Sequence, residues 1–216
     1  VQSRVRLTFS TIATQGNEKQ TGRVSPGWQQ GYEVIENYPL KEKAKSCCDQ
    51  AIRMVSAGYA PSGMMPVILC NGFGGVIFHE ACGHALEATS VGIGNSCFKD
   101  KIGHQIASSC VSARDNAGIK GEWGSYYTDD EGNDSSDLLL IENGICRNYL
   151  VDELGSRRMG MPVTGCSRRQ DYSYAPTSRM SNTYIEAGNE KPGDIISDTE
   201  YGLYCADMGG GSVDTS

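Results

Sequence analysis

The feature that most constrains the fold is residues 65–88, where a short apolar run, a glycine-rich turn and a longer run follow one another. They read MPVILC (65–70), NGFGG (71–75) and VIFHEACGHALEA (76–88). A short apolar run bounded by glycines is typical of a buried strand, and the longer run predicts a helix. The turn lacks a following Lys and a G-x-G-x-x-G pattern, so it is a poor match to a phosphate-binding loop.

The predicted helix carries two of the chain's three histidines, His79 and His84, with Glu80 beside the first. On a regular helix, residues five apart point about 140° away from each other, because each residue turns about 100°. One extra residue in the turn, most easily accommodated at Gly83, would make the histidines neighbours, and such π-bulges are frequent at functional sites. A shared metal therefore predicts a distorted turn, with Glu80 free to hold a water molecule.

Two other arrangements fit the same residues. Glu80, His84 and Glu87 lie on one face of an undistorted helix, as in helices that present carboxylates and imidazole to iron or manganese. In a purely structural arrangement, Glu80 pairs with His84 on a solvated face while His79 packs in the core, and spacing alone favours this reading. The apolar run before the motif favours a metal, because unpaired polar groups buried there would cost about 1–3 kcal/mol each.

The patterns along the whole chain predict an α+β fold of antiparallel strands with two substantial helices, one carrying the histidines. The other predicted elements are a half-buried strand (4–12), a turn region (17–27), a helix from Pro39 that stops by Gly58, a hairpin through Asn143-Gly144, a short helix closed by Gly160, a strand (179–188) and a short helix from Asp194.

Composition argues against several classes of function. The 216 residues carry a net charge of −7 and no dense Lys/Arg cluster, so nucleic acid is not an expected partner. No apolar run reaches the roughly 18 residues that a membrane span needs, so no membrane association is expected. The nine cysteines are odd in number and include no C-x-x-C pair. They are typical of free thiols in a reducing compartment, which predicts a cytoplasmic location.

The histidine segment FHEACGHALEA closely resembles the H-E-x-x-x-H helix of the TldD/PmbA family, named as modulators of DNA gyrase and understood as metallopeptidases. Four other stretches resemble family motifs in the family's order. They are GEWGSYYTDDEG (121–132), LIENG (140–144), RMSNTYIEAG (179–188) and GLYCADMGGGSVD (202–214). The collinear set covers nearly the whole chain and is more specific than the histidine motif alone.

The resemblance implies a zinc-dependent peptidase that acts on small unfolded peptides or peptide precursors. It makes His79 and His84 metal ligands, Glu80 the general base, and Glu87 a carboxylate that hydrogen-bonds a ligating histidine. The family's third ligand is a cysteine that matches no residue of this chain, so the chain alone is expected to be inactive. Cys205 lies where the family has no ligand.

The resemblance also implies how the chain is organised. Residues 1–60 are expected to end an N-terminal α/β region, and residues 61–216 to hold the motif helix and the start of a domain of twisted antiparallel sheets that continues further. Ser181, Asn182 and Thr183 lie on a predicted strand that either pairs with an extended peptide substrate or is an ordinary strand of the sheet.

The implied assembly is a dimer, with a PmbA/TldE-like paralogue or with a second copy of the chain. The intact histidine motif favours the TldD side of such a pair. The missing third ligand favours an alternative, a non-enzymatic binding or partner subunit of a TldD/TldE-type complex. A third reading is a redox or iron protein that uses Glu80, His84 and Glu87.

Overall fold

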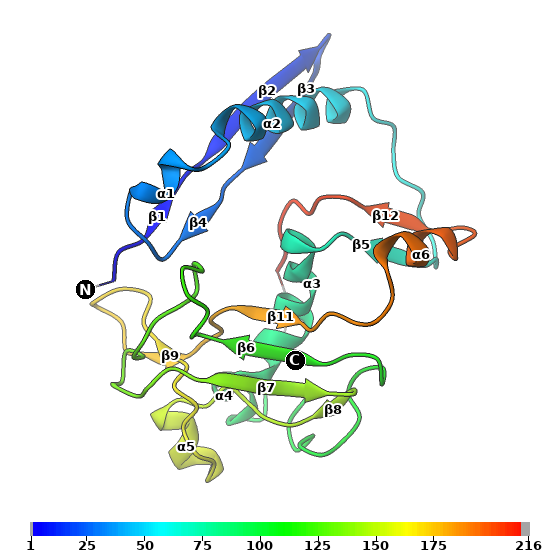
Figure 1. The fold of residues 1–216 in the computed structure, drawn as a ribbon. Helices are drawn as coiled ribbons and strands as arrows, with labels where there is room; N and C mark the ends of the chain where they lie inside the picture. The colour runs from blue at the N-terminus through cyan, green and yellow to red at the C-terminus, as the bar shows by residue number, and fades with distance from the viewer. Residues whose placement is uncertain (1, 213–216) are drawn as a thin grey trace. The chain divides into compact units, whose positions relative to one another are not determined.

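The computed structural model describes residues 2–212, which contain helices and mainly antiparallel strands, so the predicted α+β fold is confirmed (Figure 1). The chain forms two compact units. The first comprises the residues up to Gly63 together with Lys120–Trp123, and the second comprises residues 64–119 and those from Gly124 onward.

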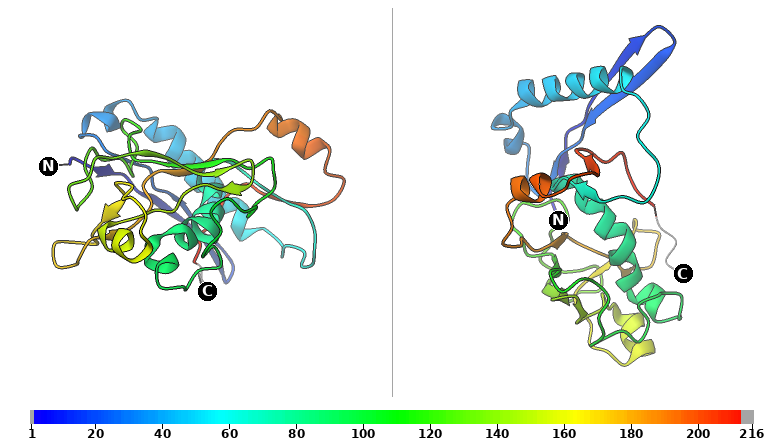
Figure 2. Two further views of the ribbon diagram at one scale, coloured as in Figure 1. Left: turned by 90° about the horizontal axis from the view of Figure 1, so that it is seen from below. Right: turned by 90° about the vertical axis from the view of Figure 1, so that its right-hand side faces the viewer.

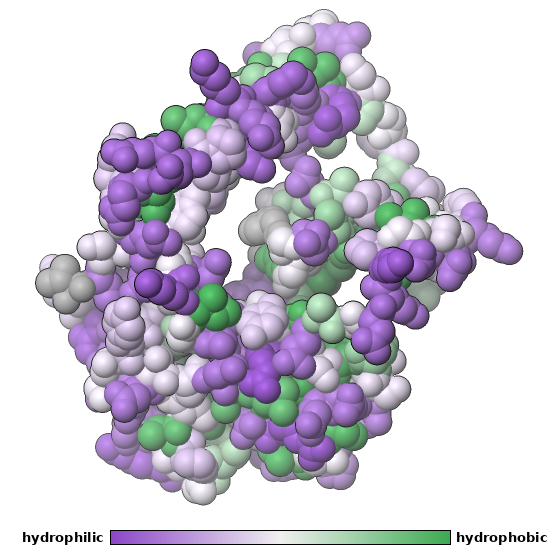
Figure 3. Space-filling view, viewed as in Figure 1, coloured by the Kyte–Doolittle hydropathy of each residue, from purple (hydrophilic) through white to green (hydrophobic). Residues whose placement is uncertain are grey.

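In the first unit, helix α2 (Leu40–Val55) packs along a hairpin of β2 (Phe9–Gln15) and β3 (Glu18–Val24) (Figures 1 and 2). A two-residue turn begins at Gly16, whose φ is 60°. A Cβ on Gly22 would overlap the carbonyl oxygen of Cys47, so the helix approaches β3 where that strand has no side chain. The visible face of α2 is largely hydrophilic (Figure 3), as expected for the predicted amphipathic helix.

The prediction of a turn region over residues 17–27 is wrong for most of its length, because residues 18–24 form β3 and residue 27 begins β4 (Gly27–Trp28). Strand β3 is polar in sequence because its outward residues are solvated and its most buried residue is a glycine. The strand predicted over residues 4–12 is divided into β1 (Val5–Arg6) and β2, since β1 pairs with β4 rather than with β3. A short helix, α1 (Glu33–Glu36), follows β4.

The second unit is built on a four-stranded antiparallel sheet. Its strands, in spatial order, are β11 (Thr183–Ile185), β6 (Ala113–Asn116), β7 (Asp137–Glu142) and β8 (Ile145–Cys146). Asn143 and Gly144, with φ of 48° and 80°, join β7 to β8, so the predicted hairpin is confirmed. The strand predicted over residues 179–188 is shorter than expected and lies at the edge of the sheet.

The core of this unit joins the sheet to the segment that carries the histidines. Its largest fully buried apolar side chains are Leu86, Leu140, Ile141, Leu150 and Val151. The N–H of Leu150 donates to the carbonyl of Leu86, and the N–H of Ala88 donates to the carbonyl of Leu150. The histidine segment is therefore fixed to the core at its C-terminal end.

Short elements complete the second unit. Helix α5 (Glu153–Met159) starts where the Asp152 side chain accepts a hydrogen bond from Gly155, and ends at left-handed Gly160 as predicted. The helix expected from Asp194 starts two residues earlier, as α6 (Pro192–Ser197), because proline is favoured in a first turn.

The remaining strands form two small pairs. β5 (Val67–Leu69) pairs in parallel with β12 (Leu203–Cys205), and β9 (Ser167–Arg168) pairs antiparallel with β10 (Thr177–Ser178). Among residues 2–212, no helix has the length and apolar character to cross a membrane.

Candidate metal centre

The two motif histidines lie on a continuous helical segment between α3 (Val76–Phe78) and α4 (Ala88–Val91) (Figure 2). Residues His79–Gly83 form a π-helical turn, and His84–Leu86 form a 3₁₀ turn. The N–H of His84 donates to the carbonyl of His79, five residues earlier, whereas an α-helix would use the carbonyl four residues earlier. The predicted distortion beside Gly83 is therefore confirmed.

The π turn brings the two imidazoles together. Their ring centroids are 4.8 Å apart, and the ring planes meet at 83°. One potential ligand atom from each of His79, Glu80 and His84 lies within 4.8 Å of the other two. This is the group that residues 2–212 offer for a shared ion, and neither Glu87 nor Cys205 belongs to it. The three side chains are partly exposed.

Glu87 lies beside the imidazole of His84. The backbone leaves the helical region at Glu87, where ψ is 135°, and its side chain is 4% exposed. Its Oε2 lies 3.2 Å from Nδ1 of His84 and 3.8 Å from a guanidinium nitrogen of Arg179. Within residues 2–212, its buried Oε1 has no hydrogen-bond partner. The structure thus places Glu87 where it can fix the orientation of the His84 ring.

Burial shifts the pKa values of two side chains here, His79 and Glu87. It lowers the pKa of His79, and the neighbouring His84 lowers that pKa further. The neutral imidazole that results is the form that binds metals. Burial also raises the pKa of Glu87, although Arg179 and His84 oppose that shift.

Hydrogen bonds within the second unit occupy the side chains of Ser181, Asn182 and Thr183. The hydroxyls of Ser181 and Thr183 donate to Asp115 at 2.7 Å each. The Asn182 amide donates to the carbonyl of Asn116 at 2.8 Å and accepts from the N–H of Gly124 at 2.9 Å. Their side chains therefore hold β11 in place.

Sequence reasoning missed Asp115, Arg179 and Met180. Asp115 is 3% exposed and holds β11, Arg179 lies beside Glu87, and Met180 is buried against Gly83. The last two belong to the stretch RMSNTYIEAG, whose resemblance to a family motif was the one signal that could have identified them.

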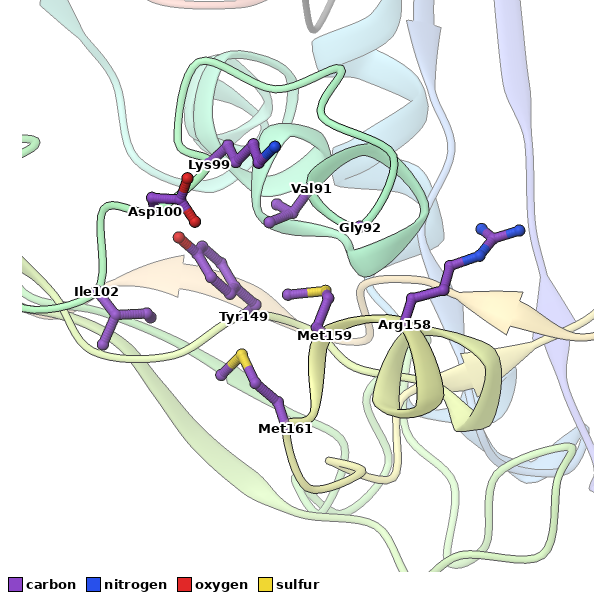
Figure 4. Close-up of a pocket in the computed structure, with 9 residues that line it drawn as sticks. All are labelled: Val91, Gly92, Lys99, Asp100, Ile102, Tyr149, Arg158, Met159 and Met161. Atoms are coloured by element: carbon purple, nitrogen blue, oxygen red, sulfur yellow. The ribbon is translucent and has the colours of Figure 1, made fainter.

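A pocket of about 460 Å³ lies between α4 and α5 (Figure 4). Lys99, Asp100 and Arg158 line it together with apolar residues such as Met159 and Met161. The histidine group does not contribute to its lining, so this pocket is separate from the candidate metal centre.

The raised pKa of Glu87 predicts how the stability of the metal-free protein changes with pH. The folded state favours the protonated carboxyl more than the unfolded chain does. The resulting stabilisation is complete below the ordinary pKa of 4.5 and is lost as the pH rises through the folded pKa. The free energy of unfolding, measured with urea from about pH 4 to about pH 7, is expected to decline in this way. The decline is expected to be smaller in Glu87→Gln.

A matched control for this experiment is Glu142→Gln. Glu142 is 44% exposed and pairs with Arg147 at the surface, so its replacement is expected to leave the decline with pH unchanged. The same slope in Glu87→Gln as in the wild type would contradict the prediction.

Comparison with known proteins identifies relatives of this chain. The family model of the PmbA/TldA metallopeptidase C-terminal domain matches residues 62–216. The metalloprotease TldD homologue of Haemophilus influenzae is 37% identical, over 97% of this chain and 45% of its own length. The zinc metalloprotease TldD homologue of Saccharolobus solfataricus is 28% identical, over 97% of this chain and 47% of its own. The chain thus spans about half the length of the curated relatives it matches.

A solved structure has the same fold. The crystal structure of TldE from Thermococcus kodakarensis matches with a TM-score of 0.75 and 19% identity, over 98% of this chain and 47% of that chain.

Proposed function

Because this chain belongs to the TldD/PmbA metallopeptidase family, we propose that it forms the metal-binding core of a zinc-dependent peptidase. His79 and His84 are the proposed ligands, and Glu80 is the proposed general base. The observation that carries this proposal is the π turn, which brings a ligand atom of each residue within 4.8 Å of the others. A helix with only a packing role does not require two imidazoles beside one another.

The donor set suits zinc. Catalytic zinc sites typically have imidazole ligands and leave one coordination position of the metal open. One relative is named a zinc metalloprotease. Nδ1 of His84 faces Glu87, which leaves Nε2 for a metal. A third ligand, a cysteine according to the family resemblance, is proposed to come from outside these 216 residues. The chain alone is then inactive.

The proposed mechanism assigns each residue a task. His79 and His84 would hold the zinc, which would supply Lewis-acid polarisation of the scissile carbonyl and lower the pKa of the attacking water. Glu80 holds that water through a carboxylate oxygen, accepts its proton and delivers the proton to the leaving amine. Glu87 accepts a hydrogen bond from Nδ1 of His84 and so holds the ring in one orientation.

The proposed substrate is a small unfolded peptide or a peptide precursor in the cytoplasm. β11 lies at the sheet edge, so an extended peptide could add to it by main-chain hydrogen bonds. Because Ser181, Asn182 and Thr183 already bond within the protein, recognition there would be largely independent of substrate sequence. The proposed assembly is a dimer with a TldE-like paralogue or a second copy. The intact histidine group favours a peptidase over a non-enzymatic subunit.

Metal analysis of the full-length protein tests the proposal. The wild type is expected to bind zinc, and His84→Ala is expected to lose it because one imidazole ligand is gone. His104→Ala is the matched control, since His104 is exposed and outside the metal group, and it should retain zinc. Zinc retained in both His79→Ala and His84→Ala would contradict the proposal. Metal retained in His79→Ala but lost in Glu80→Ala would make Glu80, and not His79, a ligand.

A further inference from the structure

We propose that residues 178–183, the positioning segment, hold the π turn in the register that brings His79 and His84 together. The inference rests on the proposed function, because it assigns positioning residues to the proposed metal site. The segment contacts the chain that carries the histidines at three residues in turn, which are Gly83, Glu87 and Thr89.

The first contact is between Met180 and Gly83, the last residue of the π turn. A Cβ on Gly83 would overlap Sδ of Met180, so the thioether fills the space that a side chain at position 83 would need. Met180 is 3% exposed and belongs to the hydrophobic core, which leaves it little room to move aside. Because Met180 packs closely against both Gly83 and the core, it keeps the extra residue of the π turn in place.

The second contact is between Arg179 and Glu87, the carboxylate beside His84. A guanidinium nitrogen of Arg179 lies 3.8 Å from Oε2 of Glu87, the same oxygen that lies 3.2 Å from Nδ1 of His84. The hydroxyl of Ser178 accepts a hydrogen bond from the N–H of Thr89 at 3.0 Å. One short segment thus supports the turn before His84 and the residues after it.

The positioning segment is itself anchored on both sides of Met180. The N–H of Arg179 donates to the carbonyl of Cys166 at 3.0 Å. On the other side, Asp115 accepts from the N–H of Ser181 at 2.8 Å and from its hydroxyl at 2.7 Å. Met180 cannot move away from Gly83 without straining these bonds. If its side chain were absent, the turn could relax toward a regular helix, which would point the imidazoles about 140° apart.

Cobalt(II) binding, followed by its absorption spectrum, tests this role in the full-length protein. Gly83→Ala is expected to weaken cobalt binding by about 10- to 100-fold, because the new methyl collides with Met180. Gly83→Ala/Met180→Ala is expected to bind cobalt more tightly than Gly83→Ala, since truncation of Met180 vacates the space. Met180→Ala alone is expected to weaken binding by about tenfold. It should also speed amide hydrogen exchange over residues 79–84 of the metal-free protein.

The matched control is Met161→Ala, which removes a partly buried methionine from the same core and should change neither readout. Equal cobalt affinity in Gly83→Ala and the double variant would overturn the inference. It would also be overturned if Met180→Ala lowered thermal stability without changing cobalt affinity or hydrogen exchange. If Gly83→Ala does not fold, the comparison of Met180→Ala with Met161→Ala decides the question.

The histidine variants separate this inference from the proposed function. If neither His79→Ala nor His84→Ala weakens cobalt binding, the proposed metal site is wrong. If both histidines are needed but Met180→Ala binds cobalt like the wild type, only the positioning role is wrong.

Discussion

Glu80→Gln is expected to lower kcat for peptide hydrolysis by about 10²- to 10⁴-fold while the full-length protein keeps its zinc. Glutamine has nearly the same shape as glutamate and can still hydrogen-bond a water molecule, but it cannot accept a proton at neutral pH. Glu80 lies on the π turn with a carboxylate oxygen within 4.8 Å of both histidine donor atoms. The expected loss therefore falls on the proton-transfer step and leaves substrate binding largely intact.

Zinc content and activity have to be measured on the same preparations. Glu153→Gln is a matched control, because Glu153 is 43% exposed in α5 and outside the metal group, and it should keep full activity. Loss of zinc together with activity in Glu80→Gln would make Glu80 a ligand instead of the base. Full activity in Glu80→Gln would remove it from the mechanism.

The π turn could be predicted from the sequence because the constraint is local. Two histidines five residues apart cannot share an ion on a regular helix, and Gly83 marks where an extra residue is easiest to accommodate. The structure has the π turn at that place. The Asn143-Gly144 hairpin and the helix end at Gly160 were predictable for the same reason, since each depends on the φ of residues within one turn.

The supports of the turn could not be predicted, because they come from residues distant in sequence. Nothing near Glu87 indicates that Arg179 will lie beside it, and nothing near Gly83 indicates that Met180 will pack on it. Strand β3 was missed for a different reason. Its buried face includes Gly22, so the strand lacks the alternating apolar residues that identify strands in a sequence.

Asp115→Ala is expected to lower the free energy of unfolding by about 3 kcal/mol, because buried donors lose their acceptor. Asp115 is 3% exposed and accepts from the N–H of Ser181 and from the hydroxyls of Ser181 and Thr183. Burial raises the pKa of this carboxyl, while these hydrogen bonds oppose that shift by favouring its charged form. Alanine cannot accept any of the hydrogen bonds, so Ser181 and Thr183 would lose their side-chain attachment to β6.

The measurement is urea unfolding of wild type and variant at neutral pH, with Asp137→Ala as the matched control. Asp137 lies at the start of β7 in the same sheet, but it is 50% exposed and pairs with Arg114 at the surface. Its loss is expected to cost less than about 1 kcal/mol, because exposed ion pairs contribute little. Equal destabilisation by the two substitutions would show that burial and the bonds to Ser181 and Thr183 do not set the contribution of Asp115. The anchoring of β11 would then depend on its backbone pairing with β6 and on the hydrogen bonds of Asn182.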